Sequence, residues 1–412
     1  MGHSHHLHLD QGDHSITVNV GPGRNGEIEL LVHGKVVACQ KQHDPGTSLL
    51  TAELPEEPAR PFRVRARRLA REACGGKLPG SDLETVRTDA RLGTEQESFD
   101  EDLGQYHCVL KNDKDKVVVA VNAYLDGADR EEEMRYIGSS YPPHAVLPGG
   151  LPGFEAENSL VYLMPECPRG GKGPTAEHRR LLVGTWTYFA KSREEKAAML
   201  RLAVRMTNEV TEKLGCGGEP LPAPKDGAVP DTGRYVPRAE AKGTACDALA
   251  TTRVPAQGRD GEVRIAIADG GVVGRCTLNA PKTAGDDAYG SNSTRPGNPL
   301  VELTSWRGDW GRKLREMGSG PAPLPMGEGA DWKPALTEDR AWAVAKCGGE
   351  NAGFAAHWGY ESLYGEAGKK YEPLTTAERN QRSVLLREYV AAFAKDQVRR
   401  GNCTGLQLPA NP

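Results

Sequence analysis

The stretch SREEKAAMLRLAVRMTNEVTEKLGC, residues 192–216, decides the fold that this sequence predicts. It opens with a capping box, because Ser192 and Glu195 stand three positions apart and each side chain can bond the other residue's backbone N–H. Apolar residues then recur every four positions and so line one face of a helix. They are Ala198, Leu202, Met206, Val210 and Leu214. Gly215 ends the pattern and Cys216 follows, so we expect a long helix with a core-facing stripe and a cysteine at its C-terminal end.

A second stretch, TTAERNQRSVLLREYVAAFAKDQVRRGNC at residues 375–403, has the same plan. Thr375 and Glu378 form its capping box, and Gly401 precedes Cys403. Its apolar stripe consists of Leu385, Tyr389, Ala392 and Phe393. Two capped amphipathic helices that each run into a cysteine indicate two copies of one structural unit. In each copy we interpret the stripe as core rather than as a groove for a partner.

Eight of the nine cysteines fall into two matching sets of four. Successive cysteines are separated by 34, 59 and 49 residues in the first set and by 30, 71 and 56 residues in the second. In both sets the third cysteine follows an apolar run, at residues 160–164 and 341–345. The sets are Cys74, Cys108, Cys167 and Cys216, and Cys246, Cys276, Cys347 and Cys403. A repeated series in a repeated context predicts an internal duplication, so residues 74–216 and 246–403 are expected to superpose as one fold.

Four cysteines in one copy allow three pairings within that copy. We predict first-to-second and third-to-fourth bonds, the latter tying the end of the long helix to the strand region. The predicted bonds are Cys74–Cys108, Cys167–Cys216, Cys246–Cys276 and Cys347–Cys403. Zinc is the competing interpretation, but no C-x-x-C spacing is present and the cysteines are dispersed. Cys39 lies outside both sets, and we expect it to be a buried, reduced thiol.

Strand-forming runs accompany the two helices, at residues 117–124 in the first copy and at 263–268 and 299–305 in the second. A sheet covered by one long helix is an α+β module. The predicted fold class is therefore α+β, with two tandem modules of antiparallel sheet plus one long helix, preceded by a small all-β domain. Between the modules, residues 217–245 contain five prolines and are expected to form a stiff, extended linker.

Residues 15–68 form the predicted all-β domain, because they contain about five short β-type runs. Residues 21–26 match G-x-G-x-x-G, but the run at 27–31 is strand-like, so we interpret the glycines as a turn and not as a dinucleotide-binding loop. Residues 1–14 are rich in histidine, which suits either a metal-binding tract or a solvated tail, and we favour the tail. The basic run at 63–71 is interpreted as a solvated, positively charged linker.

The charge balance and the hydropathy exclude some classes of function. The 412 residues carry a formal net charge of −4, from 52 basic and 56 acidic residues, which gives no basic excess for binding nucleic acid. No run approaches 18 apolar residues, and residues 1–14 lack the apolar region of a signal peptide. Paired cysteines nevertheless belong to oxidising compartments. We therefore expect an extracytoplasmic or membrane-associated protein whose export or membrane segment is not present in this sequence.

The order of these features resembles the four-cysteine extracytoplasmic modules of actinobacterial lipoproteins and, more loosely, the external sensor domains of actinobacterial receptor kinases. The shared features are an early cysteine, a second cysteine after the first strands, the turn LPGGLPG at residues 147–153, a third cysteine, and a helix that ends at the fourth. The resemblance covers residues 74–216 and, more weakly, 246–403. It implies a ligand-binding or interaction module in which disulfides brace a concave sheet, and it implies no catalytic residue.

The sequence contains no G-x-S-x-G elbow, no H-E-x-x-H motif and no Walker A loop. His107, His144, His178 and His357 are scattered, and we interpret them as structural. We accordingly predict no catalytic residue, no metal and no cofactor. The predicted function is non-enzymatic extracytoplasmic binding or sensing, with a small molecule or an envelope protein as partner. Two alternatives stay open, namely a cytosolic assembly protein with reduced cysteines and an unrecognised enzyme.

The second copy is rich in tryptophan. Trp306, Trp310, Trp332 and Trp358 are candidates for an aromatic binding surface, since aromatic side chains line pockets for carbohydrates and apolar ligands. The same side chains serve equally well as core or interface residues, and that alternative is the one we favour.

Overall fold

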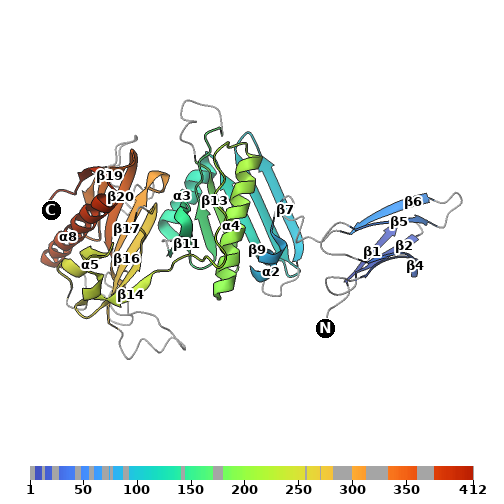
Figure 1. The fold of residues 1–412 in the computed structure, drawn as a ribbon, viewed down its shortest axis with the longest axis horizontal. Helices are drawn as coiled ribbons and strands as arrows, with labels where there is room; N and C mark the ends of the chain where they lie inside the picture. The colour runs from blue at the N-terminus through green and yellow to red at the C-terminus, as the bar shows by residue number, and fades with distance from the viewer. Residues whose placement is uncertain are drawn as a thin grey trace. The chain divides into compact units, whose positions relative to one another are not determined.

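The computed structural model describes residues 5–11, 14–20, 27–41, 48–54, 60–66, 74, 78–86, 92–140, 144–169, 180–255, 258–269, 271–281, 299–311, 333–359 and 375–411. Within these ranges the chain is α+β, as predicted, with antiparallel sheets and two long helices (Figure 1). Its internal contacts divide it into two compact units, one of residues 1–97 and 108–119 and the other of residues 98–107 and 120–412.

The N-terminal region is all-β. A four-stranded antiparallel sheet has the order β1-β2-β3-β4, and β5 and β6 form a separate hairpin. The bounds are β1 His5–Gln11, β2 His14–Val20, β3 Glu27–Val32, β4 Lys35–Lys41, β5 Ser48–Leu54 and β6 Arg60–Ala66. Alternate residues of β2 and β3 are buried, as expected for strands with one covered face. They are Ile16, Val18, Ile28, Leu30 and Val32.

The structure changes two predictions for this region and supports a third. Residues 5–11 of the histidine-rich segment form the edge strand β1, which pairs with β2 along its length, so this part is not a free tail. Residues 21–26 lie outside the described residues, but a strand follows them, as expected for a turn rather than a nucleotide-binding loop. The prediction of a buried Cys39 was wrong. Cys39 is exposed, because strand alternation places it opposite Glu29, on the face away from Leu30.

The first module is a seven-stranded sheet with the order β10-β11-β12-β13-β9-β8-β7. Its long helix, α4, spans Arg193–Lys213 and packs on β12 and β13. The strands are β7 Leu92–Asp100, β8 Gln105–Asn112, β9 Val117–Tyr124, β10 Ala145–Val146, β11 Gly153–Ala156, β12 Leu160–Leu163 and β13 Leu182–Thr187. The shorter helices are α2 Gly80–Val86, α3 Ala128–Ser140 and the 3-10 turn η1 Pro148–Gly150.

The second module has the strand order β14-β15-β16-β17-β20-β19-β18, and β21 also pairs with β19. Its long helix, α8, spans Thr376–Arg400 and packs on β19 and β20. The strands are β14 Arg234–Pro237, β15 Glu262–Ala266, β16 Val273–Asn279, β17 Pro299–Arg307, β18 Ala335–Leu336, β19 Arg340–Cys347, β20 Glu350–Trp358 and β21 Thr404–Gln407. The short helices are η3 Arg238–Ala241, α5 Asp247–Thr251 and η6 Gly308–Gly311.

The two modules share one topology. In each, three consecutive strands form a meander, β7-β8-β9 or β15-β16-β17, and the last strand before the long helix returns to pair with the third. In each, that helix packs on the two strands that precede it in the chain. The second cysteine lies in the second strand both times, as Cys108 in β8 and Cys276 in β16. These matches support the predicted internal duplication.

The capping boxes predicted for the two long helices are both present. In α4 the Ser192 hydroxyl accepts a hydrogen bond from the Glu195 N–H at 3.0 Å. In α8 the Thr375 hydroxyl accepts from the Glu378 N–H at 3.3 Å. The predicted stripes face the core, and their buried members are Ala198, Leu202, Met206, Val210, Leu385, Tyr389 and Phe393.

Both long helices end in the same way and so deliver the last cysteine of each module to the same place. The N–H groups of Cys216 and Cys403 each bond back into the last turn of the helix, at 2.9 Å, in a Schellman motif. After α4 the left-handed residue of the motif is Gly215, with φ of 62°. After α8 it is Asn402, with φ of 49°, while Gly401 is only the C-cap. The helix stop that the sequence attributes to Gly401 therefore belongs to Asn402.

All four predicted disulfides are present. The two first-to-second bonds have the same Cα–Cα distance of 5.6 Å, and the two third-to-fourth bonds share a distance of 4.2 Å. They are Cys74–Cys108, Cys167–Cys216, Cys246–Cys276 and Cys347–Cys403. Sulfurs bonded to each other offer no thiolate to a zinc ion. The matching Cα–Cα distances of equivalent bonds again fit a duplicated module.

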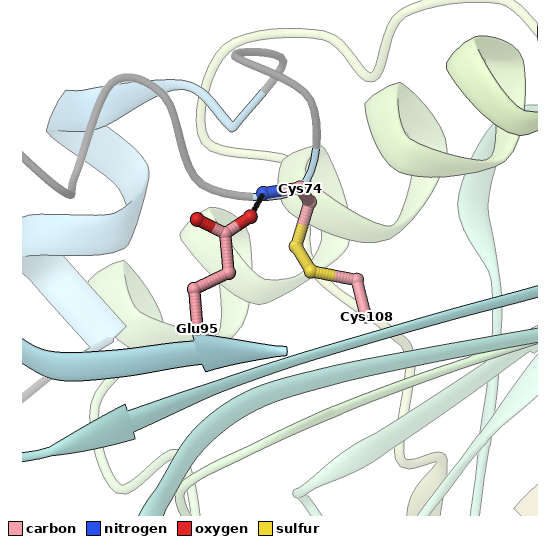
Figure 2. Close-up of side chains that lie close together, drawn as sticks. All are labelled: Cys74, Glu95 and Cys108. Carbon is pink, nitrogen blue, oxygen red and sulfur yellow. Dashed lines mark hydrogen bonds between the residues drawn. A yellow bond between two sulfur atoms is a disulfide. The ribbon is translucent and has the colours of Figure 1, made fainter. Parts of the chain in front are cut away.

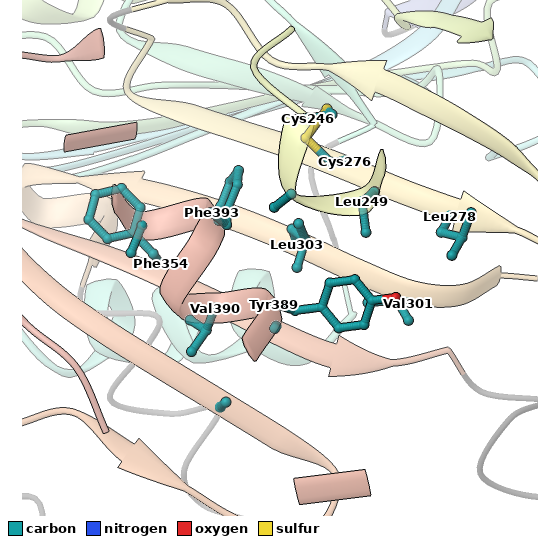
Figure 3. Close-up of a cluster of buried hydrophobic side chains, with 14 of the residues drawn as sticks. Cys246, Leu249, Cys276, Leu278, Val301, Leu303, Phe354, Tyr389, Val390 and Phe393 are labelled. Carbon is teal, nitrogen blue, oxygen red and sulfur yellow. A yellow bond between two sulfur atoms is a disulfide. The ribbon is translucent and has the colours of Figure 1, made fainter. Parts of the chain in front are cut away.

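The core of the second module lies between α8 and one face of the sheet. Figure 3 shows Tyr389, Val390 and Phe393 of the helix among side chains from the strands, with the Cys246–Cys276 disulfide beside them. The Phe393 ring meets a strand ring, that of Phe354, edge-on at a centroid distance of 6.2 Å. This core leaves the opposite face of the sheet available for other contacts.

Residues 217–245 are docked rather than a free spacer, and they are not extended throughout, because they include the 3-10 helix η3. The Asn208 side chain of α4 holds the backbone of Leu221 through two hydrogen bonds, of 2.8 and 2.9 Å. Asp231 pairs with Val146 of β10. Further along, β14 adds a strand to the second module by pairing with β15. The segment therefore belongs to the contact between the modules.

Candidate functional site

One group of metal-ligand residue types is brought together among the described residues. The Glu95 carboxylate lies beside the Cys74–Cys108 disulfide and accepts a hydrogen bond from the Cys74 N–H at 2.5 Å (Figure 2). Cys74 has a left-handed backbone, with φ of 54°, which is unusual for a residue with a Cβ. The two sulfurs are bonded to each other, so they are not available as thiolate ligands. In this oxidised form the group braces the fold.

The tryptophans considered for an aromatic binding surface do not form one among the described residues. Trp306 and Trp310 are 0% and 2% exposed and lie in the apolar contact between the two modules. Trp358 is 4% exposed and belongs to the core of the second module. Trp332 lies outside the described residues. The three that are described are core and interface residues, which is the alternative that the sequence also allowed.

The modules pack together through an aromatic cluster that we call the module joint, made of Phe154, Tyr162, Trp306, Trp310 and Trp342. The ring of Phe154 meets Trp306 at a centroid distance of 5.7 Å and Trp310 at 5.3 Å, both close to edge-on. Edge-to-face pairs of this kind contribute about 0.5–1.5 kcal/mol each beyond the area they bury. The joint therefore couples the stability of one module to that of the other.

Two salt bridges also link the modules across the described residues. Arg130 of α3 is buried and contacts the Asp309 carboxylate of η6 at 3.4 Å. Arg180, just before β13, bonds to Glu350 at the start of β20. These contacts tie the face of the first module that bears α3 to the face of the second module that lies opposite α8.

Beside the joint, the second module carries charged residues on this same face. Arg275 of β16 forms a salt bridge with Glu302 of β17. His357 of β20 stands opposite Glu302 in the sheet register, with 3.8 Å between its Nε2 and the carboxylate. Burial is the largest single effect on Glu302 and raises its pKa. The charges of Arg275, His357 and Arg264 and the hydrogen bond from Arg275 together outweigh burial, so the net shift of the pKa is downward. Burial lowers the pKa of His357, so at neutral pH an ion pair stands beside a neutral imidazole.

The first module holds a buried carboxyl group on the face of β11 that α4 covers. Glu155 of β11 is 1% exposed, and among the described residues neither of its carboxylate oxygens has a hydrogen-bond partner of normal geometry. Its backbone carbonyl accepts from the His144 N–H at 2.8 Å. The Asn158 amide lies 3.5 Å from the His144 Nε2. Arg264 of β15 reaches over from the second module and donates to the His144 carbonyl, so residues of both modules converge here.

We call this set of residues the polar junction. It comprises His144, Glu155, Asn158, Arg264, Arg275, Glu302 and His357. Burial raises the pKa of Glu155 to about 7, against the smaller opposing effects of the Asn158 backbone and the charges of Lys196 and Arg264. Burial lowers the pKa of His144 to about 4, and the charges of Arg264, Lys196 and Arg275 add to that effect. Both groups are therefore neutral over a range of mildly acidic pH, and such perturbed groups are enriched at functional sites.

The LPGGLPG turn positions Glu155 in this junction. Gly149 and Gly150 have φ of 70° and 73°, a backbone conformation that favours glycine. A Cβ at Gly153 would lie 1.9 Å from the Tyr162 carbonyl oxygen, so only glycine lets β11 approach β12 this closely. Strand alternation then sends Phe154 into the module joint and Glu155 to the opposite face of β11.

Replacing Thr185 with valine is expected to leave the free energy of unfolding unchanged or to raise it by about 1 kcal/mol. The Thr185 hydroxyl is fully buried and has no hydrogen-bond partner in the described part of the chain, and valine has nearly the same shape. Thr207 is the matched control, because its buried hydroxyl donates to the Ala203 carbonyl at 2.7 Å. Thr207→Val should lower the free energy of unfolding by about 0.5–1.5 kcal/mol, as measured by urea denaturation. An equal loss of stability in both variants would contradict the conclusion that the Thr185 hydroxyl makes no hydrogen bond.

Sequence reasoning singled out only two members of the polar junction, His144 and His357, and treated them as structural. Glu155 could have been singled out, because a carboxylate inside a short apolar strand such as Gly153–Ala156 is unusual. Arg264 gave no signal of a functional role in the sequence. An arginine between Val263 and Ile265 is the pattern of an ordinary strand whose polar residue faces solvent. The contact of Arg264 with the first module becomes visible only in the folded structure, where the two modules pack together.

The four disulfides indicate an oxidising compartment, which favours an extracytoplasmic location. Among the described residues, no helix combines the length and the apolar character that crossing a membrane requires. Comparison with known protein families, with curated proteins and with solved structures finds no match, and the resemblance to actinobacterial extracytoplasmic modules stays a prediction.

Proposed function

We propose that this chain is a non-enzymatic, extracytoplasmic binding or sensing protein whose ligand is a small molecule with an acidic group, held at the polar junction. The four disulfides support the compartment. The observation that carries the proposed binding is that charged side chains of the second module, Arg264 and Arg275, converge on His144 of the first. Converging polar groups between packed units are typical of ligand sites.

The balance of charge in the junction favours an acidic ligand. Two guanidinium groups, Arg264 and Arg275, face one ionised carboxylate, that of Glu302. Among the described residues the Arg275 Nε has no hydrogen-bond partner, and neither does the hydroxyl of Thr304, which stands directly opposite Arg275 in the sheet register. These two groups can donate together to a carboxylate or a phosphate.

The same residues also give a ligand a route from solvent. The side chains of Arg275 and His357 are 14% and 25% exposed, whereas Thr304 and Arg264 are buried. An acidic group entering past His357 would therefore reach Arg275 first. Exchange of surface water for these charge-assisted hydrogen bonds is the expected source of affinity.

The test is a thermal-shift screen with small carboxylates, phosphates and sulfates, each paired with its neutral ester. A ligand at 100 times its Kd should stabilise the protein by about 2.7 kcal/mol. The double variant Arg275→Gln/Glu302→Gln keeps hydrogen-bonding groups but removes both charges, and we expect at least about tenfold weaker binding. Arg253→Gln is the control, since that arginine is 57% exposed and paired with Glu388 on α8. Equal stabilisation by the acids and their neutral esters, or binding by the double variant with wild-type affinity, would contradict the proposal.

A catalytic role is the second candidate, because one observation favours it. Burial raises the pKa of Glu155 to about 7, a value that suits a general acid or base near neutral pH. Chemical conversion of a compound that binds, lost in Glu155→Gln but kept in Glu157→Gln, would favour an enzyme over a binding protein. The two carboxyl groups differ in burial, since Glu155 is buried and Glu157 is exposed.

A further inference from the structure

One of the four disulfides has a carboxylate beside it. The sulfurs of Cys74 and Cys108 and a carboxylate oxygen of Glu95 all lie within 4.8 Å of one another (Figure 2). Both cysteines are buried, whereas Glu95 on β7 is partly exposed. Within the ranges that the structure describes, no other disulfide has a histidine nitrogen or an acidic oxygen this close to both of its sulfurs. These three ligand atoms therefore distinguish the Cys74–Cys108 bond from the rest.

The equivalent bond of the second module lacks such a neighbour and serves as an internal comparison. Cys246–Cys276 spans the same Cα–Cα distance of 5.6 Å as Cys74–Cys108. Its cysteines belong to the apolar core beneath α8, and Ile265 stands directly opposite Cys276 in the sheet register. The two bonds thus bridge equal distances but have different side chains around them. A brace alone does not need the carboxylate, because the second module is braced without one.

The backbone of one of the two cysteines holds Glu95 against the sulfurs. The Cys74 N–H donates to the Glu95 Oε1 at 2.5 Å, so Cys74 presents its N–H and its sulfur to the same carboxylate. It does so with a left-handed backbone, with φ of 54°. In metal sites, hydrogen bonds to a ligating carboxylate fix its orientation. The carboxylate is therefore already placed beside both sulfurs before any ion binds.

We propose that the Cys74–Cys108 bond is a redox switch whose reduction turns Cys74, Cys108 and Glu95 into a zinc site. Zinc binds thiolates and carboxylates in a tetrahedral arrangement, which can consist of three protein ligands and one water. The two sulfurs and one carboxylate oxygen supply the three protein ligands. The oxidised bond braces the fold instead and excludes the metal. This inference goes beyond the proposed ligand site at the polar junction and does not depend on it.

The switch requires a dithiol reductant, because dithiols open protein disulfides by thiol–disulfide exchange. The dithiol gives up two electrons and two protons and becomes a disulfide. The bond between the protein sulfurs breaks, and each sulfur takes up one electron and one proton to become a thiol. Zinc then forms two Zn–S bonds and one Zn–O bond, and the two thiol protons pass to solvent.

The folded chain can make this change without moving its backbone far. A Zn–S bond of about 2.3 Å and a tetrahedral angle put the two sulfurs about 3.8 Å apart. Rotation of the cysteine side chains between staggered rotamers provides that separation while the Cα atoms stay 5.6 Å apart. The electrostatics favour a cation, because two thiolates beside a carboxylate repel one another. A divalent ion removes this repulsion and so allows both thiols to ionise.

The experiment reduces the full-length protein with a phosphine and follows the alkylation of each cysteine by peptide mass mapping, with and without zinc. At a zinc concentration of 100 times the Kd, about one site in a hundred is free, so alkylation of Cys74 and Cys108 should slow about 100-fold. Cys246 and Cys276 should be alkylated at the same rate with and without zinc. Because this measurement is specific to each cysteine, zinc bound elsewhere on the chain does not affect its interpretation.

Glu95→Gln should weaken zinc binding at least about tenfold. Glu97→Gln is the matched control on the same strand, because Glu97 is exposed and lies outside the group of ligand atoms, and it should keep the wild-type Kd. Equal protection of the cysteines in both modules, or an unchanged Kd in Glu95→Gln, would overturn the switch. A reduced chain that unfolds would bind zinc through any two cysteines, so it would give these same results and also count against the proposal.

Cobalt provides a second measurement, because tetrahedral Co²⁺ with thiolate ligands absorbs visible light. The reduced wild-type protein should show this absorption, and the oxidised protein should not. The double variant Cys74→Ser/Cys108→Ser should lack it under reducing conditions, while full absorption in that variant would assign the metal to other cysteines and refute the proposal. The result of the ligand screen at the polar junction does not bear on this test.

Discussion

Replacing Trp306 with alanine is expected to lower the free energy of unfolding by about 3–5 kcal/mol and to let the two modules unfold in separate steps. Trp306 is fully buried in the module joint, and its ring packs edge-on against Phe154 of the first module. The substitution leaves a large cavity where the two modules meet, so it weakens the coupling between them as well as the core. Urea denaturation followed by fluorescence and by circular dichroism should change from one transition to two.

Phe189→Ala is the control for this experiment, because that ring is 55% exposed and its loss should change stability by no more than about 0.5 kcal/mol. A loss below about 1 kcal/mol for Trp306→Ala, with a single transition retained, would show that the joint does not couple the modules.

Removing the Cys167–Cys216 disulfide is expected to lower the free energy of unfolding by about 2–5 kcal/mol. The bond closes a segment with a sequence separation of 49 and clamps the end of α4 to the loop after β12. Unfolding of the double variant Cys167→Ala/Cys216→Ala should start in the first module, as followed by hydrogen exchange. Cys216→Ser alone should also leave Cys167 as a reactive thiol. Cys39→Ser is the control, since Cys39 is exposed and unpaired, and it should have no measurable effect.

Peptide mapping without reduction, on protein taken from its native compartment, gives the second arm of this test. Four linked peptide pairs are expected, each within one module. Bonds between the modules would contradict the two-module architecture. Eight reduced thiols would instead favour a cytosolic assembly protein, because stable disulfides belong to oxidising compartments.

The local parts of this structure were predictable from the sequence. A capping box needs only two residues three positions apart, so Ser192 and Glu195 were enough to place the start of α4. The pairing of the cysteines was predictable because two similar series of four suggested one solution for both modules. Even so, the stop of α8 was assigned to Gly401 rather than to Asn402, since both residue types suit a helix end and only the backbone distinguishes them.

The polar junction and the module joint were decided by tertiary structure alone. Glu155 and Arg264 belong to strands of different modules, and their environment depends on how two sheets approach, which no local pattern encodes. The same holds for Trp306, because the sequence around an aromatic residue does not distinguish a place in a core from one in an interface or a pocket. The sequence by itself determined two capped helices, two sets of paired cysteines and an α+β repeat. Burial then decided which polar groups stay neutral, because the cost of burying a charge depends on partners that only the folded chain brings together.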